Sequence, residues 1–253
     1  ALRLIHGLKS RLSRDSDFSF HDKIEKEEVF FKYLESAIRK EFSKSKLYII
    51  DFKPTRKPKI KKTGAPDFWG GWAVEFKLIT KEQLNLPEAR RSSSAIVPEG
   101  FLTNKIPIDI NEMEYCEGIE TIKVKSIKIK VYSKPLLVLE KLRAICQSHP
   151  DYKYRITQSN RARDFYDIEQ IYTKVLNEGE IDNFFKELSK HIVKVFEAKS
   201  VPLSLIDSCL RSDDFLKSQE IGWQEVESTV KGLNQNFSYY VQTVKDIVRK
   251  INL

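Results

Sequence analysis

The sequence predicts an α+β protein, with a mixed β-sheet domain over residues 1–134 followed by a helical bundle over residues 135–253. Two observations support this class. Before residue 135, apolar and polar residues alternate over short stretches, which is the pattern of half-buried strands. From Pro135 onward the apolar residues recur every three or four positions, as they do on one face of a helix. A chain of 253 residues is long enough for two such domains to bury a core each.

The first domain is expected to contain several strands and one helix. Strands are predicted at residues 15–20, 47–52, 68–79, 106–110 and 122–131, and a helix at 23–42. Pro107 implies an edge position or a bulge in its strand, because proline cannot donate a ladder hydrogen bond. The alternation changes phase at Ser126, which predicts a bulge or a bend at that residue.

Two apolar stripes predict long helices in the second domain. They consist of Ile168, Ile171, Tyr172 and Val175, and of Phe184, Phe185, Leu188, Ile192, Val195 and Phe196. Pro202 interrupts this pattern before further helices that reach Ile251.

The charge balance favours polyanionic partners. Lys and Arg number 44 against 36 Asp and Glu, which gives a formal net charge of +8. Nucleic acid or a nucleotide is therefore the leading class of partner. No apolar run approaches the roughly 18 residues that cross a bilayer, so we expect a cytoplasmic protein with no membrane association.

Cysteine and histidine are too scattered to suggest chemistry of their own. The three cysteines, Cys116, Cys146 and Cys209, are odd in number and lack a Cys-x-x-Cys spacing, so all three are expected to be reduced thiols. The four histidines are equally dispersed, and neither a zinc site nor a Cys–His nucleophile is supported. Any bound metal should be held by oxygen ligands.

Residues 53–62 carry six cations and two prolines, which predicts an exposed basic loop or hairpin tip. Contact with RNA phosphates is one interpretation, because clustered cations release condensed counterions on binding. A solvated loop is the other, and the sequence does not decide between them.

Two carboxylates, Asp15 and Asp17, stand two residues apart in the first predicted strand. In an extended strand residues i and i+2 project from the same face, so both carboxylates share one face while Phe18 and Phe20 hold the other to a core. Like charges held side by side call for a bridging cation, and hydrated Mg²⁺ carrying a nucleoside triphosphate is the natural candidate. A surface turn is the alternative interpretation of the pair.

Three segments resemble motifs of one family, the AbiEii/AbiGii-type nucleotidyltransferase toxins of the DNA polymerase β-like superfamily. They are residues 1–18 (ALRLIHGLKSRLSRDSDF), 134–145 (KPLLVLEKLRAI) and 161–168 (RARDFYDI). In the family a glycine-rich turn precedes the first motif and cradles the triphosphate. The chain starts at Ala1, where that turn should end, so we expect the glycines to lie immediately upstream.

The resemblance assigns roles to individual residues. It implies a nucleotidyltransferase of the EC 2.7.7 type that uses two Mg²⁺ ions, with Asp15 and Asp17 as catalytic metal ligands. It places Lys141 against the triphosphate and Asp164 as a residue that orients Lys141 or acts as a base, both reaching the cleft from the helical domain. The remaining assignments are Arg11, Ser13 and Arg14 near nucleotide phosphates, and Arg163 with Asp167 in the Lys141 cluster, although an Arg–Asp pair could equally fasten two helices together.

A third carboxylate normally completes such a metal site. Asp109 and Glu75 both lie on predicted strands with apolar residues in the opposite phase. Asp109 is preferred, because Ile-Pro-Ile-Asp-Ile resembles a later strand of the family, and Glu75 remains the alternative.

The family resemblance also implies a biological setting. It predicts a toxin of a toxin–antitoxin or abortive infection system that adds a nucleotide to RNA, with the 3′ end of tRNA as the implied acceptor. Addition of AMP to protein hydroxyls uses the same chemistry and stays open. A cognate antitoxin is expected to act without a stable complex. The alternative function is a catalytically silent module that binds nucleic acid or a protein partner.

Overall fold

A computed structural model describes residues 6–7, 16–58, 66, 68–124, 126–154, 159–230 and 232–251 of the chain. The protein forms two compact units. One comprises Ser13–Glu114, and the other comprises Ala1–Leu12 together with Tyr115–Leu253. The functional boundary predicted between residues 134 and 135 stays a prediction, and the segment 115–134 groups with the helices.

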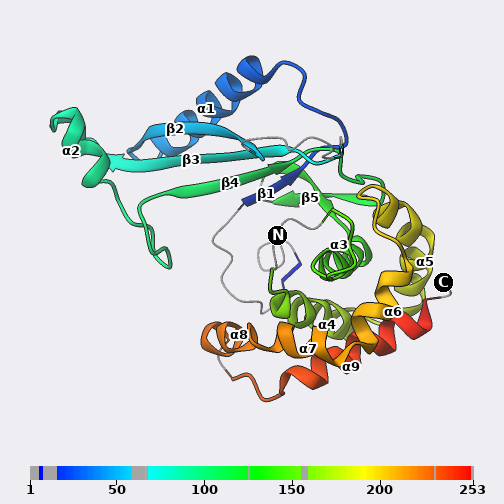
Figure 1. Ribbon diagram of the computed structural model, residues 1–253. Coiled ribbons are helices and arrows are strands. Elements are labelled where there is room, and N and C mark those ends of the chain that lie inside the picture. The colour runs from blue at the N-terminus through cyan, green and yellow to red at the C-terminus, as the bar shows by residue number, and fades with distance from the viewer. Residues whose placement is uncertain are drawn as a thin grey trace. The chain divides into compact units, whose positions relative to one another are not determined.

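The unit Ser13–Glu114 is built on a four-stranded mixed sheet in the order β1-β4-β3-β2 (Figure 1). Its strands are β1 (Ser16–Ser19), β2 (Leu47–Lys57), β3 (Gly71–Thr80) and β4 (Ile106–Asn111). The pair β1–β4 is parallel, whereas β2–β3 and β3–β4 are antiparallel. The predicted α+β class, with a mixed sheet followed by helices, is confirmed.

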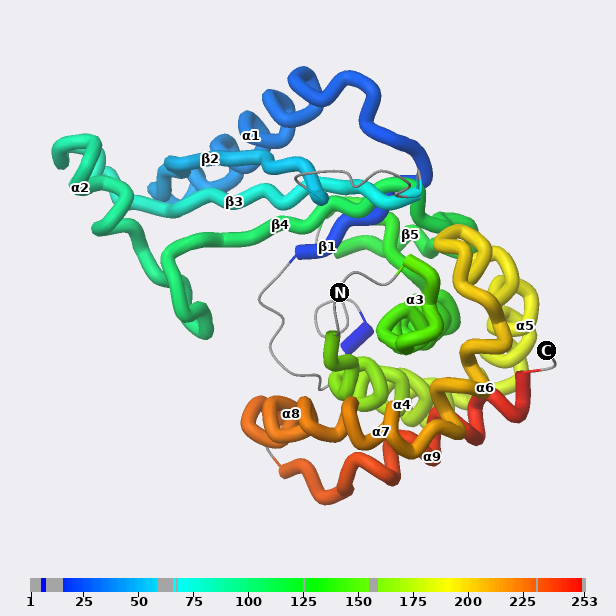
Figure 2. The backbone as a smooth tube through the Cα atoms, viewed as in Figure 1, coloured from blue at the N-terminus to red at the C-terminus, as the bar shows by residue number. Residues whose placement is uncertain are grey.

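One face of this sheet is covered by α1 (Glu27–Ser43), which runs along β2 in Figures 1 and 2. Aromatic rings join the two layers. Phe31 contacts Trp72 with ring centroids 4.7 Å apart, and Phe42 contacts Phe76 at 5.8 Å. Because side chains alternate along each strand, packing one face against α1 leaves the polar residues on the other face.

The chain between β3 and β4 contains a 3₁₀ turn, η1 (Glu82–Asn85), and a short helix, α2 (Glu88–Ser93). Ile96 forms an isolated bridge with Leu78 of β3. The Ser93 and Ser94 hydroxyls donate to the carbonyls of Arg90 and Arg91, so the serines add hydrogen bonds at the end of this helix.

Three expectations about this unit were wrong in detail. Phe18 does not anchor β1, since 49% of its surface is exposed, and only Phe20 packs, edge-on to Phe30 at 5.6 Å. Pro107 lies on β4, which is an interior strand of the sheet and not an edge strand. The described pairing of β4 with β1 begins at Ile108, one residue after Pro107. Residues 53–57 of the basic segment form the end of β2 and not a loop, while residues 59–62 lie outside the described part of the chain.

The second unit begins with a separate hairpin of β5 (Ile119–Val124) and β6 (Ile127–Tyr132). The phase change at Ser126 is therefore a chain reversal between Val124 and Ile127, which are Cα partners, and not a bulge within one strand. The helices follow: α3 (Lys134–Gln147), α4 (Ala162–Glu178), α5 (Ile181–Glu197), α6 (Ser204–Arg211), α7 (Asp213–Glu220), α8 (Trp223–Thr229) and α9 (Phe237–Lys250).

Helix boundaries in this unit follow local chemistry. Ser133 caps α3 by accepting a hydrogen bond from the Leu136 N–H, and Pro135 occupies the first turn, where no intrahelical N–H bond is lost. Gly179 ends α4 at φ 72°, a conformation that glycine adopts without steric cost. The two predicted apolar stripes lie on α4 and α5 and pack in the helical core, where Phe184, Leu188 and Phe196 are buried.

Two further findings concern the cysteines and the length of the helices. The three cysteines are free thiols, as predicted, with Cys146 and Cys209 buried and Cys116 partly exposed. In the parts of the chain that the structure describes, no helix combines the length and the apolar character needed to cross a membrane.

Candidate active site

The strand register places two acidic residues side by side. Asp17 of β1 and Asp109 of β4 are Cα partners in the parallel pair, flanked by the pairs Ser16–Ile108 and Phe18–Ile110. Partner residues on neighbouring strands share a face and lie about 4.8 Å apart. Ile108 and Ile110 are buried in the core under α1, so the two carboxylates project from the opposite, polar face of the sheet.

The remaining residues of the first motif cannot be placed. Asp15, Arg11, Ser13 and Arg14 lie outside the described residues. In the described part of the chain, no group of three or more His, Cys, Asp or Glu side chains could hold a metal ion. Asp17 and Asp109 nevertheless offer oxygen ligands from adjacent positions, which is the donor type that Mg²⁺ prefers.

Glu75, the alternative third carboxylate, lies farther from Asp17. On β3, Ala73 is the Cα partner of Asp109, and Glu75 is the partner of Pro107, two residues along. The Glu75 carboxylate pairs with the Lys105 ammonium at 2.8 Å. The register therefore favours Asp109 as the residue that joins Asp17.

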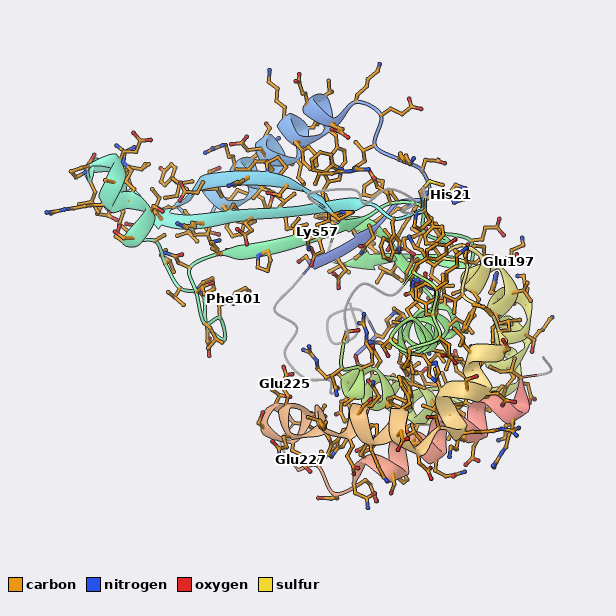
Figure 3. All side chains as sticks on the ribbon, in the orientation of Figure 1. His21, Lys57, Phe101, Glu197, Glu225 and Glu227 are labelled. Carbon is orange, nitrogen blue, oxygen red and sulfur yellow. The ribbon has the colours of Figure 1, made fainter. Side chains whose placement is uncertain are left out.

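Lys57 joins the acidic pair from the end of β2, a contact that the sequence did not reveal. Its Nζ lies 2.5 Å from Asp109 Oδ1, and Figure 3 labels Lys57 on this sheet. The residue opposite Lys57 on β3 is Gly71, where a Cβ would lie 2.2 Å from the Ile110 carbonyl oxygen. Only glycine fits there, because a Cβ would collide with the backbone of β4. Only the register of β2 against β3 would have predicted the contact between Lys57 and Asp109, and the sequence alone does not determine that register.

A buried carboxylate supports the end of β4. Glu112, 1% exposed, pairs with Arg56 Nη1 at 2.8 Å and accepts hydrogen bonds from Trp72 Nε1 at 3.3 Å and from the Ile24 N–H at 3.1 Å. Arg56 also lies over the Trp72 ring at 5.0 Å. These contacts tie β2, β3 and the segment after β1 to the strand that carries Asp109. Charged hydrogen bonds of this kind are stronger than neutral ones and hold the strand ends rigidly.

In the helical unit, Lys141 of α3 contacts two carboxylates of α4. Its Nζ lies 3.1 Å from Asp164 Oδ1 and 2.6 Å from Asp167 Oδ2. Asp164 and Asp167 are one turn apart and share a helix face. Side-chain exposure is 16% for Lys141, 14% for Asp164 and 1% for Asp167. The predicted association of Lys141 with Asp164 and Asp167 is therefore present.

The electrostatics of this cluster determine the charge on Lys141. Burial by itself lowers the pKa of the ammonium, but the charges and hydrogen bonds of Asp164 and Asp167 outweigh burial, and the pKa is raised above its usual value. Lys141 is thus a fixed cation at neutral pH. It is suited to neutralising anionic charge and not to accepting a proton.

Arg163 does not join the Lys141 cluster. Its Nη1 lies 3.5 Å from Glu225 Oε1 of α8, a residue labelled in Figure 3. The neighbouring Arg161 approaches instead, with Nη1 3.7 Å from Asp164 Oδ2. Helix geometry explains the difference, because residue 163, in the first turn of α4, lies about 100° away from residue 164 around the helix axis. A role for Arg163 in phosphate binding stays a prediction.

The comparison with protein families decides the assignment. A family model described as "Nucleotidyl transferase AbiEii toxin, Type IV TA system" matches residues 1–247. The chain belongs to the AbiEii nucleotidyltransferase toxin family. This membership confirms the resemblance drawn from the three motifs and indicates nucleotidyl transfer in a toxin–antitoxin system. No curated protein matches the chain.

In this AbiEii-family protein, the start of α4 is held by a set of side chains that the sequence did not reveal. Asn160 donates from Nδ2 to the carbonyls of Ser218 and Gln219, at 3.0 and 2.7 Å, and its Oδ1 accepts from the Ala162 N–H at 2.9 Å. The buried Gln219 accepts from the Arg161 N–H at 2.6 Å. These bonds fix the turn that presents Asp164. The bonds to Ser218 and Gln219 join positions nearly 60 residues apart, so no local sequence pattern predicts them.

Proposed function

We propose that this AbiEii-family toxin transfers a nucleotide from a nucleoside triphosphate to an RNA hydroxyl in a Mg²⁺-dependent reaction. The single observation that carries the proposal is the register that pairs Asp17 with Asp109 on the polar face of the sheet. Asp15 is the third proposed ligand, by its position two residues before Asp17.

By holding Mg²⁺, the acidic residues would lower the main barrier of the reaction. An anionic triphosphate must approach an anionic acceptor, so the barrier is largely electrostatic. Asp17 and Asp109, with Asp15, would hold the divalent ions, and bound Mg²⁺ would stabilise the charge on the attacking and leaving oxygens. The network around Glu112 keeps the strand ends from moving, which preserves the spacing of the ligands.

The motif resemblance of residues 134–145 implies a second source of positive charge in Lys141. A permanently charged ammonium suits the departing pyrophosphate, because charge develops on that group as the bond breaks. Asp167 is the anchor of Lys141, since it is the more buried partner and the closer one. Asp164 is the more exposed partner, and its Oδ1 lies 3.1 Å from Lys141 Nζ. It can therefore orient Lys141 and can also be replaced beside Lys141 by a phosphate oxygen.

The acceptor is proposed to be RNA, with the 3′ end of tRNA as the first substrate to examine. The net charge of +8 supports a polyanionic acceptor over a neutral protein hydroxyl. An antitoxin acting without a stable complex, and a role in abortive infection, belong to the same proposal and rest on the family.

Label transfer tests the proposal directly. The protein is incubated with each α-labelled nucleoside triphosphate, Mg²⁺ and total RNA, and labelled RNA is resolved on a denaturing gel. Asp17→Asn and Asp109→Asn are expected to lower transfer by at least about a hundredfold. Glu75→Gln is the matched control and should retain activity. Transfer that survives both aspartate changes would overturn the proposed site.

A silent nucleic-acid-binding module is the second candidate function. The Lys57–Asp109 ion pair favours it, because the protein's own lysine already neutralises this carboxylate. Titration with Mn²⁺, followed by electron paramagnetic resonance, separates the two candidates. Saturable binding that is lost in Asp17→Asn supports the enzyme, and absence of any binding supports the silent module.

A further inference from the structure

The hairpin β5–β6 has two chemically different faces. Cα partners in an antiparallel pair share a face, and Lys123 is paired with Lys128 while Thr121 is paired with Lys130. Lys123, Lys128 and Lys130 therefore project from one face, which we call the lysine face. The opposite face carries the apolar partners Ile122 and Ile129 with Glu120, Val124, Ile127 and Val131.

The lysine face keeps like charges close together. Lys123 and Lys128 are directly opposed, with Cβ atoms about 5 Å apart, an arrangement that destabilises a sheet when both residues are charged. All three lysines are exposed, and none forms an ion pair with a residue that the structure describes. Other lysines of the same unit are paired with carboxylates, namely Lys134, Lys141, Lys174, Lys190 and Lys194. The hairpin alone opposes two lysines across strands, among the pairings given for the described strands.

We infer that the lysine face of β5–β6 binds the phosphate backbone of a nucleic acid. Lys128 and Lys130 are separated by about 6.8 Å along β6, a distance comparable to that between consecutive phosphates of an extended strand. Each ammonium is a compact point charge that neutralises a phosphate and releases its counterions. A bound backbone would also relieve the repulsion between Lys123 and Lys128.

The composition of the face distinguishes nucleic acid from protein. Protein interfaces are enriched in aromatic residues, Met and Arg at their cores and depleted in Lys. The lysine face offers three lysines and a threonine, with the partners Ile119 and Tyr132 at its base, where both pack against the helical core. Among the paired residues of the hairpin that the structure describes, none near the tip is an arginine or an aromatic residue, so the face contacts the backbone and does not read base sequence.

The register also argues against a lipid surface. Val124 and Ile127, 37% and 61% exposed, are the apolar residues at the tip. They belong to the face opposite the lysines. A membrane that took up these apolar side chains would leave Lys123 and Lys128 pointing away from the anionic headgroups.

This inference deepens the proposed function, because the bound backbone would belong to the RNA acceptor. Binding is measured without a nucleoside triphosphate, so its failure is separate from a failure of transfer. Fluorescence anisotropy of labelled single-stranded RNA, single-stranded DNA and duplex RNA, over a range of salt concentrations, gives the affinity and the salt slope. Vesicles containing phosphatidylserine form a further arm.

The test variant is K123Q/K128Q/K130Q, and the matched control K186Q/K190Q/K217Q removes the same charge from exposed lysines of helices in the same unit. The hairpin variant should reduce the slope of log K against log salt by about 2 for single-stranded RNA, since each phosphate contact contributes about 0.7. The control should change it by less than half of that. Equal slopes in the two variants, or loss of vesicle binding with RNA binding intact, would overturn the inference.

Two further measurements keep the result interpretable. K123R/K128R/K130R retains the charge and is expected to bind RNA within about threefold of the wild type. The melting temperature of the glutamine variant should equal or exceed that of the wild type, because a repulsive pair is removed. If that variant fails to fold, Lys128→Gln alone should lower the slope by about 0.7, and an unchanged slope would contradict the inference.

Discussion

At the scale of single residues, the protein repeatedly pairs one cation with carboxylates on a neighbouring element. Lys141 with Asp164 and Asp167, and Lys57 with Asp109, are the two cases that bear on the proposed chemistry. They differ in burial. The Lys141 cluster is shielded from solvent, so its partners matter for stability, whereas Lys57 is 54% exposed and can leave Asp109 at low cost.

Asp167→Asn should destabilise the fold by about 3 kcal/mol, because it removes the negative charge that pairs with the buried ammonium of Lys141. The free energy of unfolding is measured by urea denaturation monitored by circular dichroism. Asp207→Asn, in the exposed pair with Arg211, is the control and should cost less than about 0.5 kcal/mol. Equal costs for the two changes would show that the Lys141 cluster is not a stabilising pair.

Lys57→Met should tighten Mn²⁺ binding by about fivefold, because an exposed ion pair worth about 1 kcal/mol no longer competes for Asp109. Electron paramagnetic resonance of free Mn²⁺ measures the dissociation constant. Lys105→Met, which frees Glu75 in the same way, is the matched control and should leave the constant unchanged. A tightening confined to Lys105→Met would move the metal site to Glu75.

Tyr115 gives a prediction about pH. Burial, reinforced by the hydrogen bond to Glu117, raises the pKa of its hydroxyl to about 12. A raised pKa in the folded state means that the unfolded chain loses this proton at a lower pH. The contribution of Tyr115 to the free energy of unfolding is therefore fully present below pH 10 and is lost as the pH rises toward 12. Between these values the free energy of unfolding should fall more steeply in the wild type than in Tyr115→Phe. Parallel slopes in the two proteins would contradict the assignment.

At the scale of elements, the start of α4 depends on contacts with the C-terminal end of α7 and the turn that follows it. Asn160 and Gln219 form these contacts, and Gly222 leaves room for them. A Cβ on Gly222 would lie 2.0 Å from Asn160 Oδ1, and Asn160 cannot move away without losing its bonds to the backbone. The C-terminal end of α7 and the turn after it therefore position the helix that carries Asp164.

Gly222→Ala should cost about 1–3 kcal/mol of stability, as overpacking does at a site that cannot relax. Denaturant unfolding of the single variants and of the double variant completes a mutant cycle with Asn160→Ala. Once Asn160 has been truncated, the added methyl group has little to collide with. The double variant should therefore lose less stability than the sum of the losses in the two single variants. Strict additivity would mean that the two residues do not share this contact.

At the scale of the whole molecule, the sequence predicted what periodicity and local motifs encode. Alternation predicted the strand β4 although not its interior position, the apolar stripes predicted α4 and α5, and the motifs predicted that Lys141 meets Asp164. Contacts that depend on register or on distant chain segments escaped prediction. Lys57 of β2 reaches Asp109 of β4 across the intervening strand β3, and Gln219 meets Arg161 across the helical unit.

Periodicity also failed where it does not say which face is covered or which way a side chain turns. Phe18 alternates as a core residue should, yet it lies on the edge strand β1 and is half exposed. Arg163 stands within the motif but turns toward Glu225. The placement of Asp15, predicted from the same motif, lies outside the described residues.

The central claim is that Asp109 binds the divalent ion on which nucleotidyl transfer depends, beside Asp17. Asp109→Cys tests it by changing the ligand from a hard oxygen to a soft thiolate, which disfavours Mg²⁺ and favours softer ions such as Cd²⁺. The measurement is label transfer to RNA by this variant in Mg²⁺ and then with Cd²⁺ added. The account predicts that transfer is lost in Mg²⁺ and recovers with Cd²⁺, whereas wild-type rates in Mg²⁺ alone would contradict it.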